Sequence, residues 1–131
     1  MINLPKYSFD THTLVWYFEN SDTLSKEAKS ILDDAFLGNC LAFVSSMVLL
    51  EAFHISLKDK DFLFPEFVDF LSRAGFIIIS LDEDVLKIGY ELPRNINIHD
   101  RVIISTAILT GSKLVTKDRI LRSAFPHETI W

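Results

Sequence analysis

Short hydrophobic stretches alternate along this chain with segments in which hydrophobic residues recur every three or four positions. A short, unbroken hydrophobic stretch predicts a strand that is buried on both faces of a sheet. Such strands are predicted at residues 7–9, 41–44, 76–79 and 113–116, and an additional edge strand is predicted at residues 129–131.

The segments between these stretches have the periodicity of amphipathic helices. They cover residues 14–18, 25–36, 46–57, 65–74, 82–92 and 99–109. Because strands and helices alternate, the sequence predicts an α/β fold, a three-layer α/β/α sandwich with a central, mostly parallel sheet. No repeat or flexible linker divides the chain, so residues 1–131 are predicted to form a single domain.

Composition narrows the class of protein. Hydrophobic residues make up 49% and charged residues 24% of the 131 residues, which is typical of a globular domain and not of a disordered chain. The single cysteine, Cys40, excludes an internal disulfide and is interpreted as a small buried residue. No signal peptide and no hydrophobic stretch of about 18 residues is visible, so we expect a cytoplasmic protein without a membrane segment.

The charge is distributed unevenly. The net charge of −5 argues against a nucleic-acid-binding protein, but residues 94–122 carry six of the 13 basic and only two of the 18 acidic residues. A basic segment of this kind can contact phosphate even in an acidic chain. Arg101, Lys117 and Arg119 are the candidate phosphate contacts, and an ordinary solvated charge or salt bridge is the alternative interpretation for each of them.

Four acidic residues stand near the predicted carboxyl ends of strands, where α/β sheets bind their ligands. Asp10 and Asp118 follow two strands, Glu51 lies in the helix after a third, and Asp100 lies in the first turn of a long helix. Each has a simpler interpretation alone, as a helix cap, a favourable partner of a helix dipole or a solvated residue. Together they would repel one another unless they bind a divalent cation, and oxygen ligands favour Mg²⁺ or Mn²⁺.

The same residues resemble a known family. Residues 7–16 (YSFDTHTLVW) resemble the opening of a PIN domain of the VapC-type toxin branch, and residues 98–107 (IHDRVIISTA) resemble its third acidic motif. Residues 45–51 and 114–118 are similar to the second and fourth motifs, which are less specific. The resemblance covers nearly the whole chain, with the motifs in the expected order.

This resemblance implies a PIN-like fold and a Mg²⁺- or Mn²⁺-dependent endoribonuclease that leaves 5′-phosphate and 3′-hydroxyl ends. It assigns the metal site to Asp10, Glu51, Asp100 and Asp118, with Glu51 bound directly or through water. It also implies a toxin that is neutralised by a small antitoxin protein, and a homodimer. The segment 95–99 lacks the Asp-Pro-Phe of some relatives, and no further acid follows Asp118, so the subfamily and the number of metal ions stay open.

Two threonines are predicted to support the site, and the histidines are predicted to have lesser roles. Thr11 and Thr116 could orient water at the metal, whereas hydrogen bonding at the strand ends is the simpler interpretation. His12, His54 and His99 lack the close pairing typical of zinc sites, so a zinc hydrolase is disfavoured.

Two other functions compete with a ribonuclease. A non-catalytic PIN-like scaffold would bind RNA or protein without cleaving it, and a receiver-type phosphoacceptor would use Lys113 or Lys117 beside an acidic cluster, although the motif order fits this poorly. The aromatic residues at 16–18 and the four phenylalanines between residues 62 and 70 are assigned mainly to the core, with one or two left for a partner groove or dimer surface.

Overall fold

A single parallel sheet organises the protein, of which the computed structural model describes residues 3–131. Within these residues, five strands pair in the order β3-β2-β1-β4-β5, and every pairing is parallel. The strands are β1 (Lys6–Phe9), β2 (Leu41–Ser45), β3 (Ile77–Ile79), β4 (Lys113–Val115) and β5 (Thr129–Ile130). The predicted parallel sheet is therefore confirmed, including the edge strand near the end of the chain.

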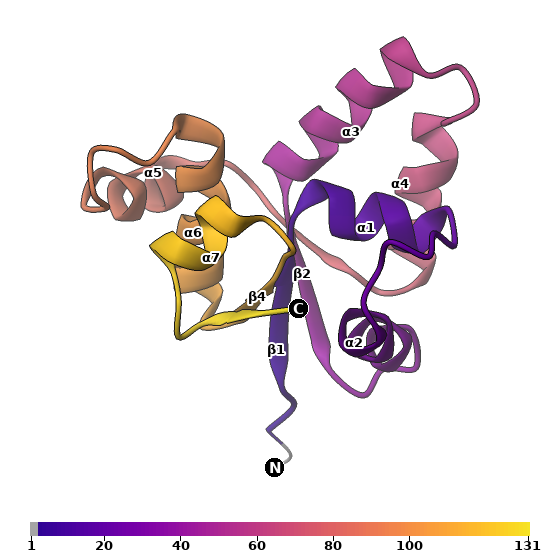
Figure 1. The fold of residues 1–131 in the computed structure, drawn as a ribbon, viewed down its shortest axis with the longest axis horizontal. Helices are drawn as coiled ribbons and strands as arrows, with labels where there is room; N and C mark the ends of the chain where they lie inside the picture. The colour runs from indigo at the N-terminus through magenta and orange to yellow at the C-terminus, as the bar shows by residue number, and fades with distance from the viewer. Residues whose placement is uncertain (1–2) are drawn as a thin grey trace.

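Helices cover both faces of this sheet. Figure 1 shows α1 to α4 on one side of the sheet and α5 to α7 on the other, which confirms the predicted three layers. Their bounds are α1 (Thr11–Phe18), α2 (Lys26–Phe36), α3 (Ser46–Lys58), α4 (Phe64–Arg73), α5 (Glu83–Tyr90), α6 (Ile98–Thr110) and α7 (Arg119–Ala124). None of the helices in residues 3–131 is both long and hydrophobic enough to cross a membrane.

The strand order reverses at β1. The chain moves from β1 through β2 to β3 on one side, then returns to place β4 and β5 on the other side. In the β1–β4 pair, Phe9 is in register with Val115, so Asp10 and Thr116 follow the carboxyl ends of neighbouring strands. In open α/β sheets, ligands bind at such a reversal. The topology therefore places the first and fourth acidic motifs side by side.

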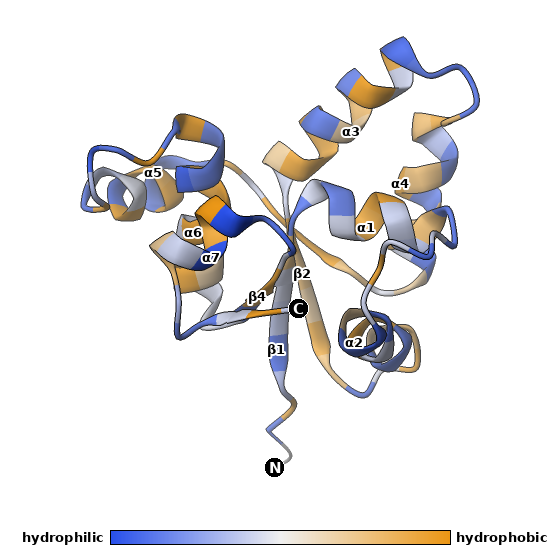
Figure 2. Cartoon of the chain, in the orientation of Figure 1, coloured by the Kyte–Doolittle hydropathy of each residue, from blue (hydrophilic) through white to orange (hydrophobic). Residues whose placement is uncertain are grey.

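The core joins the sheet to both helical layers. Phe9, Val44 and Leu114 of three strands are almost fully buried, as are Leu14 of α1 and Ile104 of α6. Figure 2 shows hydrophobic residues along β2 and alternating hydrophobic and hydrophilic bands along α3. The hydrophobic stripe of α2 packs inward, as the helical periodicity predicted, whereas α3 buries Met47, Val48 and Ala52 and leaves several other hydrophobic side chains exposed.

Phenylalanines form one end of this core. Phe62 and Phe67 are buried, and the ring of Phe18 meets Phe62, Phe67 and Phe70 edge-on at centroid distances of 5.4 to 5.9 Å. Edge-on pairs of this kind stabilise a core beyond the area that they bury. The assignment of most of these aromatic residues to the core is consistent with the structure, while Phe64 and Phe70 are only half-buried.

One strand differs from the prediction. Residues 76–79 were predicted to form a strand buried on both faces, but Ile77 and Ile78 of β3 are 41% and 42% exposed. The prediction of complete burial was wrong here because β3 lies at the edge of the sheet, with β2 as its neighbour. An unbroken hydrophobic stretch does not by itself distinguish an edge strand from a central one.

Candidate active site

Asp10 ends β1 and begins α1. Its carboxylate accepts hydrogen bonds from the Thr13 amide (3.1 Å), the Thr13 hydroxyl and the Thr116 hydroxyl. It therefore caps α1, which was the simpler of the two interpretations of this residue. Burial raises the pKa of Asp10, and the hydrogen bonds from Thr116 and Thr13 and the nearby His12 partly oppose that rise. Asp10 is thus a rigidly held carboxylate in surroundings that disfavour its charge.

Thr116 joins the first and fourth acidic motifs. Its buried hydroxyl donates to the carboxylate of Asp10 and accepts a hydrogen bond from the backbone amide of Asp118 at 3.0 Å. Asp118 in turn caps α7 through the amides of Ile120 and Leu121, at 2.8 and 3.1 Å. A hydroxyl two residues before Asp118 therefore fixes the start of α7 relative to Asp10.

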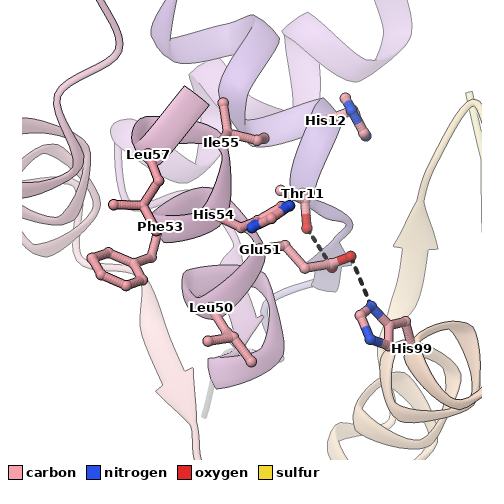
Figure 3. Close-up of a pocket in the computed structure, with 9 residues that line it drawn as sticks. All are labelled: Thr11, His12, Leu50, Glu51, Phe53, His54, Ile55, Leu57 and His99. Atoms are coloured by element: carbon pink, nitrogen blue, oxygen red, sulfur yellow. Dashed lines mark hydrogen bonds and ion pairs between the residues drawn. The ribbon is translucent and has the colours of Figure 1, made fainter. Parts of the chain in front are cut away.

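Glu51 is held from two sides. The Thr11 hydroxyl donates to Glu51 Oε1 at 2.7 Å, and Nδ1 of His99 lies 3.2 Å from Glu51 Oε2. Figure 3 shows these contacts joining the start of α1 and the first turn of α6 to the middle of α3. A fully solvated Glu51 was the alternative interpretation from the sequence. Glu51 is instead half-buried.

Asp100 lies in the first turn of α6, whose N-cap is Asn97. The Asn97 side chain accepts a hydrogen bond from the Asp100 amide at 2.9 Å, and its amide group donates to the Asp100 carboxylate at 2.8 Å. Burial and the charge of Asp118 raise the pKa of Asp100 most strongly. The hydrogen bond from Asn97 lowers it, and the charges of Glu51 and Asp10 raise it further. Each of the other three acids therefore raises the pKa of Asp100.

The four acids lie near enough for the charges of Asp118, Glu51 and Asp10 to add to burial in raising the pKa of Asp100, but they do not form a closed set of ligands in the described residues. In residues 3–131, no three histidine, cysteine or acidic side chains lie close enough together to hold a metal ion in their present positions. An ion would have to draw these side chains closer together. Their donor atoms are all oxygens, which is the set that Mg²⁺ and Mn²⁺ prefer, and mutual repulsion favours a cation among them.

In the part of the chain that the structure describes, no lysine or arginine forms an ion pair with any of the four acids. Within residues 3–131, the ion pairs of lysine and arginine are Lys29 with Asp33 and Arg73 with Asp69, both outside the four acids. His99 is the sole ion-pairing partner of Glu51 in that range, and it is charged only when protonated. The chemistry of the four residues therefore fits a divalent cation supplied from solution.

Arg101, one of the predicted phosphate contacts, forms hydrogen bonds within the protein, and its contact with phosphate stays a prediction. Its guanidinium donates four hydrogen bonds of 2.6 to 3.0 Å to carbonyl oxygens in and after α5. The acceptors are Gly89, Leu92, Pro93 and Ile96. Its donors are thus used to hold the turn that precedes α6, and phosphate would have to compete with these carbonyls.

Lys117 and Arg119 are exposed on either side of Asp118. The Lys117 ammonium lies 5.8 Å from the centre of the Trp16 ring, within the range of a cation–π contact. Both side chains stand at the carboxyl end of β4, beside the acidic residues. Their contact with phosphate stays a prediction.

The histidines supplied one contact that the sequence did not predict. The sequence did not reveal that His99 contacts Glu51, because the two residues lie 48 positions apart. The hydrogen bonds between Asn97 and Asp100 were also missed. Asn97 had a recognisable signal, since an asparagine three positions before an acid is typical of a helix start.

A largely apolar pocket of about 560 Å³ borders the site (Figure 3). Its lining includes Thr11, Glu51 and His99 together with hydrophobic side chains of α3. Leu50 and Leu57 are 59% and 69% exposed, and Phe53 is 45% exposed. Exposed hydrophobic side chains gathered around a pocket are typical of binding surfaces. The candidate site residue Glu51 is therefore continuous with an apolar surface.

Comparisons with known proteins agree with this architecture. The family model described as the PIN domain matches residues 7–124. The crystal structure of VapBC2 from Rickettsia felis bound to a promoter DNA fragment is similar, with a TM-score of 0.72 and 22% identity over 95% of this chain and 97% of that chain. A toxin–antitoxin complex from Klebsiella pneumoniae has a TM-score of 0.68 and 20% identity over 95% and 96%. No curated protein sequence gives a significant match.

Proposed function

Because this chain belongs to the PIN-domain family, we propose that it is an endoribonuclease that uses Mg²⁺ or Mn²⁺ to cleave RNA phosphodiester bonds. One observation carries the proposal. Hydrogen bonds connect the segments of all four acids, through Thr116 between Asp10 and Asp118 and through Glu51 between Thr11 and His99. Asp10 and Asp118 also cap helices, but burial and the charges of Asp118, Glu51 and Asp10 raise the pKa of Asp100, so gathering the four acids carries a cost that a bound cation would offset.

The proposed reaction is hydrolysis at phosphorus. The oxygen of a water molecule forms a new bond to phosphorus while the bond from phosphorus to the 3′ oxygen breaks, which leaves 5′-phosphate and 3′-hydroxyl ends. A bound divalent ion would lower the pKa of the attacking water and would offset negative charge on the phosphate and on the leaving oxygen.

The residues of the chain position the ion and its ligands. Asp10, Asp100 and Asp118 would hold the ion, and Glu51 would ligate it directly or through water. Thr13 and Thr116 fix the carboxylate of Asp10. These hydrogen bonds hold the Asp10 side chain in one orientation, which reduces the cost of ordering it as a ligand.

The test is RNA cleavage by the purified chain and its variants. Asp10→Asn and Asp100→Asn should abolish cleavage in Mg²⁺ or Mn²⁺ and leave the circular dichroism spectrum unchanged, and a chelator should abolish cleavage by the unmodified chain. Asp61→Asn, which changes an exposed acid in the turn between α3 and α4, is the matched control. Full activity of Asp10→Asn, or activity that survives the chelator, would reject the mechanism. RNA binding without cleavage would favour the non-catalytic scaffold.

We also propose that the protein is a cytoplasmic toxin neutralised by a small antitoxin, and that it forms a homodimer. The similar structures from Rickettsia felis and Klebsiella pneumoniae are toxin–antitoxin assemblies, which supports the partner. The apolar pocket beside Glu51 offers a surface that an antitoxin segment could cover. Co-purification with the product of an adjacent small gene, with loss of ribonuclease activity in the complex, tests this proposal. Light scattering tests the dimer.

A further inference from the structure

A second pocket, lined in part by Asp10, combines acids with an aromatic ring. Its volume is about 370 Å³, and its lining includes Asp10, Asp118 and Trp16. His12 and Lys117 complete the lining. The pocket therefore joins two of the proposed metal ligands to a tryptophan that is only half-buried.

Contacts from two directions fix the Trp16 ring. The ring of Trp131, which follows β5, meets it edge-on with the centroids 5.9 Å apart and an angle of 65°. His12, one turn earlier on α1, lies 5.6 Å away at 45°. Because Asp10 caps the same helix, the distance between the ring and the carboxylate depends on the short, regular α1. Trp16 is thus a pre-positioned flat surface beside the site.

The positive charges near this ring are suited to the phosphate groups of a nucleotide. Lys117 lies near the ring and Arg119 follows it in the chain, and both are exposed. A base that stacks on an exposed aromatic ring carries its phosphates past such cations, and stacking of this kind requires a single-stranded nucleic acid whose base faces are accessible. A tryptophan that served only the core would instead be covered on both faces.

We propose that Trp16 stacks against one base of single-stranded RNA and thereby determines which phosphodiester bond reaches the acidic site. This inference rests on the proposed ribonuclease function for its consequence, although the stacking itself does not require cleavage. On binding, Lys117 exchanges its contact with the ring for contact with a phosphate. Trp16 acts as a specificity-determining residue, and it takes no part in the bond-breaking step.

Fluorescence provides a direct test because Trp16 and Trp131 are the only two tryptophans of the chain. Trp131→Phe leaves Trp16 as the sole reporter, and Asp100→Asn in the same chain keeps the RNA intact in Mg²⁺. A short single-stranded RNA should quench the emission, whereas the same RNA annealed to its complement should not. If Trp131→Phe fails to fold, the chain with both tryptophans serves in the same titration.

Binding and cleavage are then measured with stacking variants. Trp16→Ala should weaken binding of the single-stranded RNA, measured by fluorescence anisotropy, about tenfold or more, while Trp16→Tyr should restore most of it. In the catalytically intact chain, Trp16→Ala should raise KM more than it lowers kcat and should spread the cuts over more positions.

The outcomes separate the two proposals. Quenching by RNA without any cleavage by the unmodified chain would reject the proposed function and retain the stacking. RNA binding with unchanged Trp16 emission, an unchanged KM and cut pattern in Trp16→Ala, or no RNA binding at all would overturn the stacking. So would quenching by an arginine-rich peptide but not by RNA, since that result would identify a protein partner.

Discussion

The hydroxyl of Thr11 donates a 2.7 Å hydrogen bond to the carboxylate of Glu51, forty residues later in the chain. Thr11 is the first residue of α1 and directly follows Asp10, whereas Glu51 lies in the middle of α3. A single buried hydroxyl therefore sets the position of one proposed metal ligand relative to another. The threonine is a positioning residue, and the serine at the same position would retain the donor.

Loss of this donor should impair the site more than the fold. Thr11→Val keeps the shape of the side chain but leaves a half-buried carboxylate oxygen without its donor, which we expect to cost about 1 to 2 kcal/mol of unfolding free energy. RNA cleavage should fall about tenfold or more, and Thr11→Ser should restore it. Thr23→Val, at an exposed threonine, is the matched control. Cleavage by Thr11→Val at the rate of the unmodified chain would contradict the role assigned to this hydrogen bond.

Divalent ions should stabilise the folded protein through the four acids. A ligand that binds only the folded state at 100 times its Kd adds about 2.7 kcal/mol to the free energy of unfolding. Thermal unfolding followed by circular dichroism should therefore shift upward as Mg²⁺ or Mn²⁺ is added, and a chelator should reverse the shift. The shift should be lost in Asp100→Asn and kept in Asp61→Asn. An equal shift in both variants would mean that the ions bind elsewhere.

The sequence predicted the fold well because its signals are local. The helical periodicity, the caps at Ser25 and Asp82 and the left-handed Gly111 that ends α6 all operate within a few residues. The rule that ligands bind at strand ends pointed to Asp10 and Asp118, which follow adjacent parallel strands and line one pocket.

Contacts between distant segments could not be predicted from the sequence. The pairing of His99 with Glu51 depends on how α3 and α6 approach each other across the end of the sheet. The exposure of Ile77 and Ile78 depends on which strand lies at the edge. Both follow from tertiary arrangement, which hydrophobic patterns alone do not specify.

The ionisation of two acids should oppose folding when no ion is present. Burial raises the pKa of Asp10, and burial together with neighbouring carboxylates raises that of Asp100, from an ordinary value of 3.8. A carboxyl group with a raised pKa in the folded state favours folding below its unfolded pKa, and this contribution is lost as the pH rises through the folded value.

Urea unfolding in the presence of a chelator should reveal this effect, when the free energy of unfolding of Asp100→Asn is compared with that of the unmodified chain. Asp100→Asn cannot ionise, so its stability relative to the unmodified chain should increase from pH about 4 to neutral pH. In saturating Mg²⁺ the order should reverse, because the ion requires ionised carboxylates. A stability difference that is constant with pH in chelator would show that Asp100 does not experience the neighbouring charges.

The turn before α6 should depend on Arg101 and Gly89. A Cβ atom on Gly89 would lie 3.0 Å from the Ser105 hydroxyl oxygen and 3.3 Å from Cγ of Arg101, so Gly89→Ala would push these side chains aside. Arg101 is needed there, since its four hydrogen bonds to carbonyl oxygens hold the turn. Lysine cannot reproduce this planar set of donors.

Arg101→Lys should therefore lower the free energy of unfolding by about 3 kcal/mol, as expected for the loss of several hydrogen bonds from a charged donor. Well below the melting temperature, its KM for RNA should change little, whereas Lys117→Met should leave stability nearly unchanged and weaken RNA binding. The dependence of RNA binding on salt separates the two roles, because each lost phosphate contact reduces the slope of log K against log salt by about 0.7 for a single strand. Because lysine keeps the positive charge, the phosphate role of Arg101 is tested with Arg101→Met: a reduced slope in that variant without a loss of stability would support the phosphate contact that the sequence predicted.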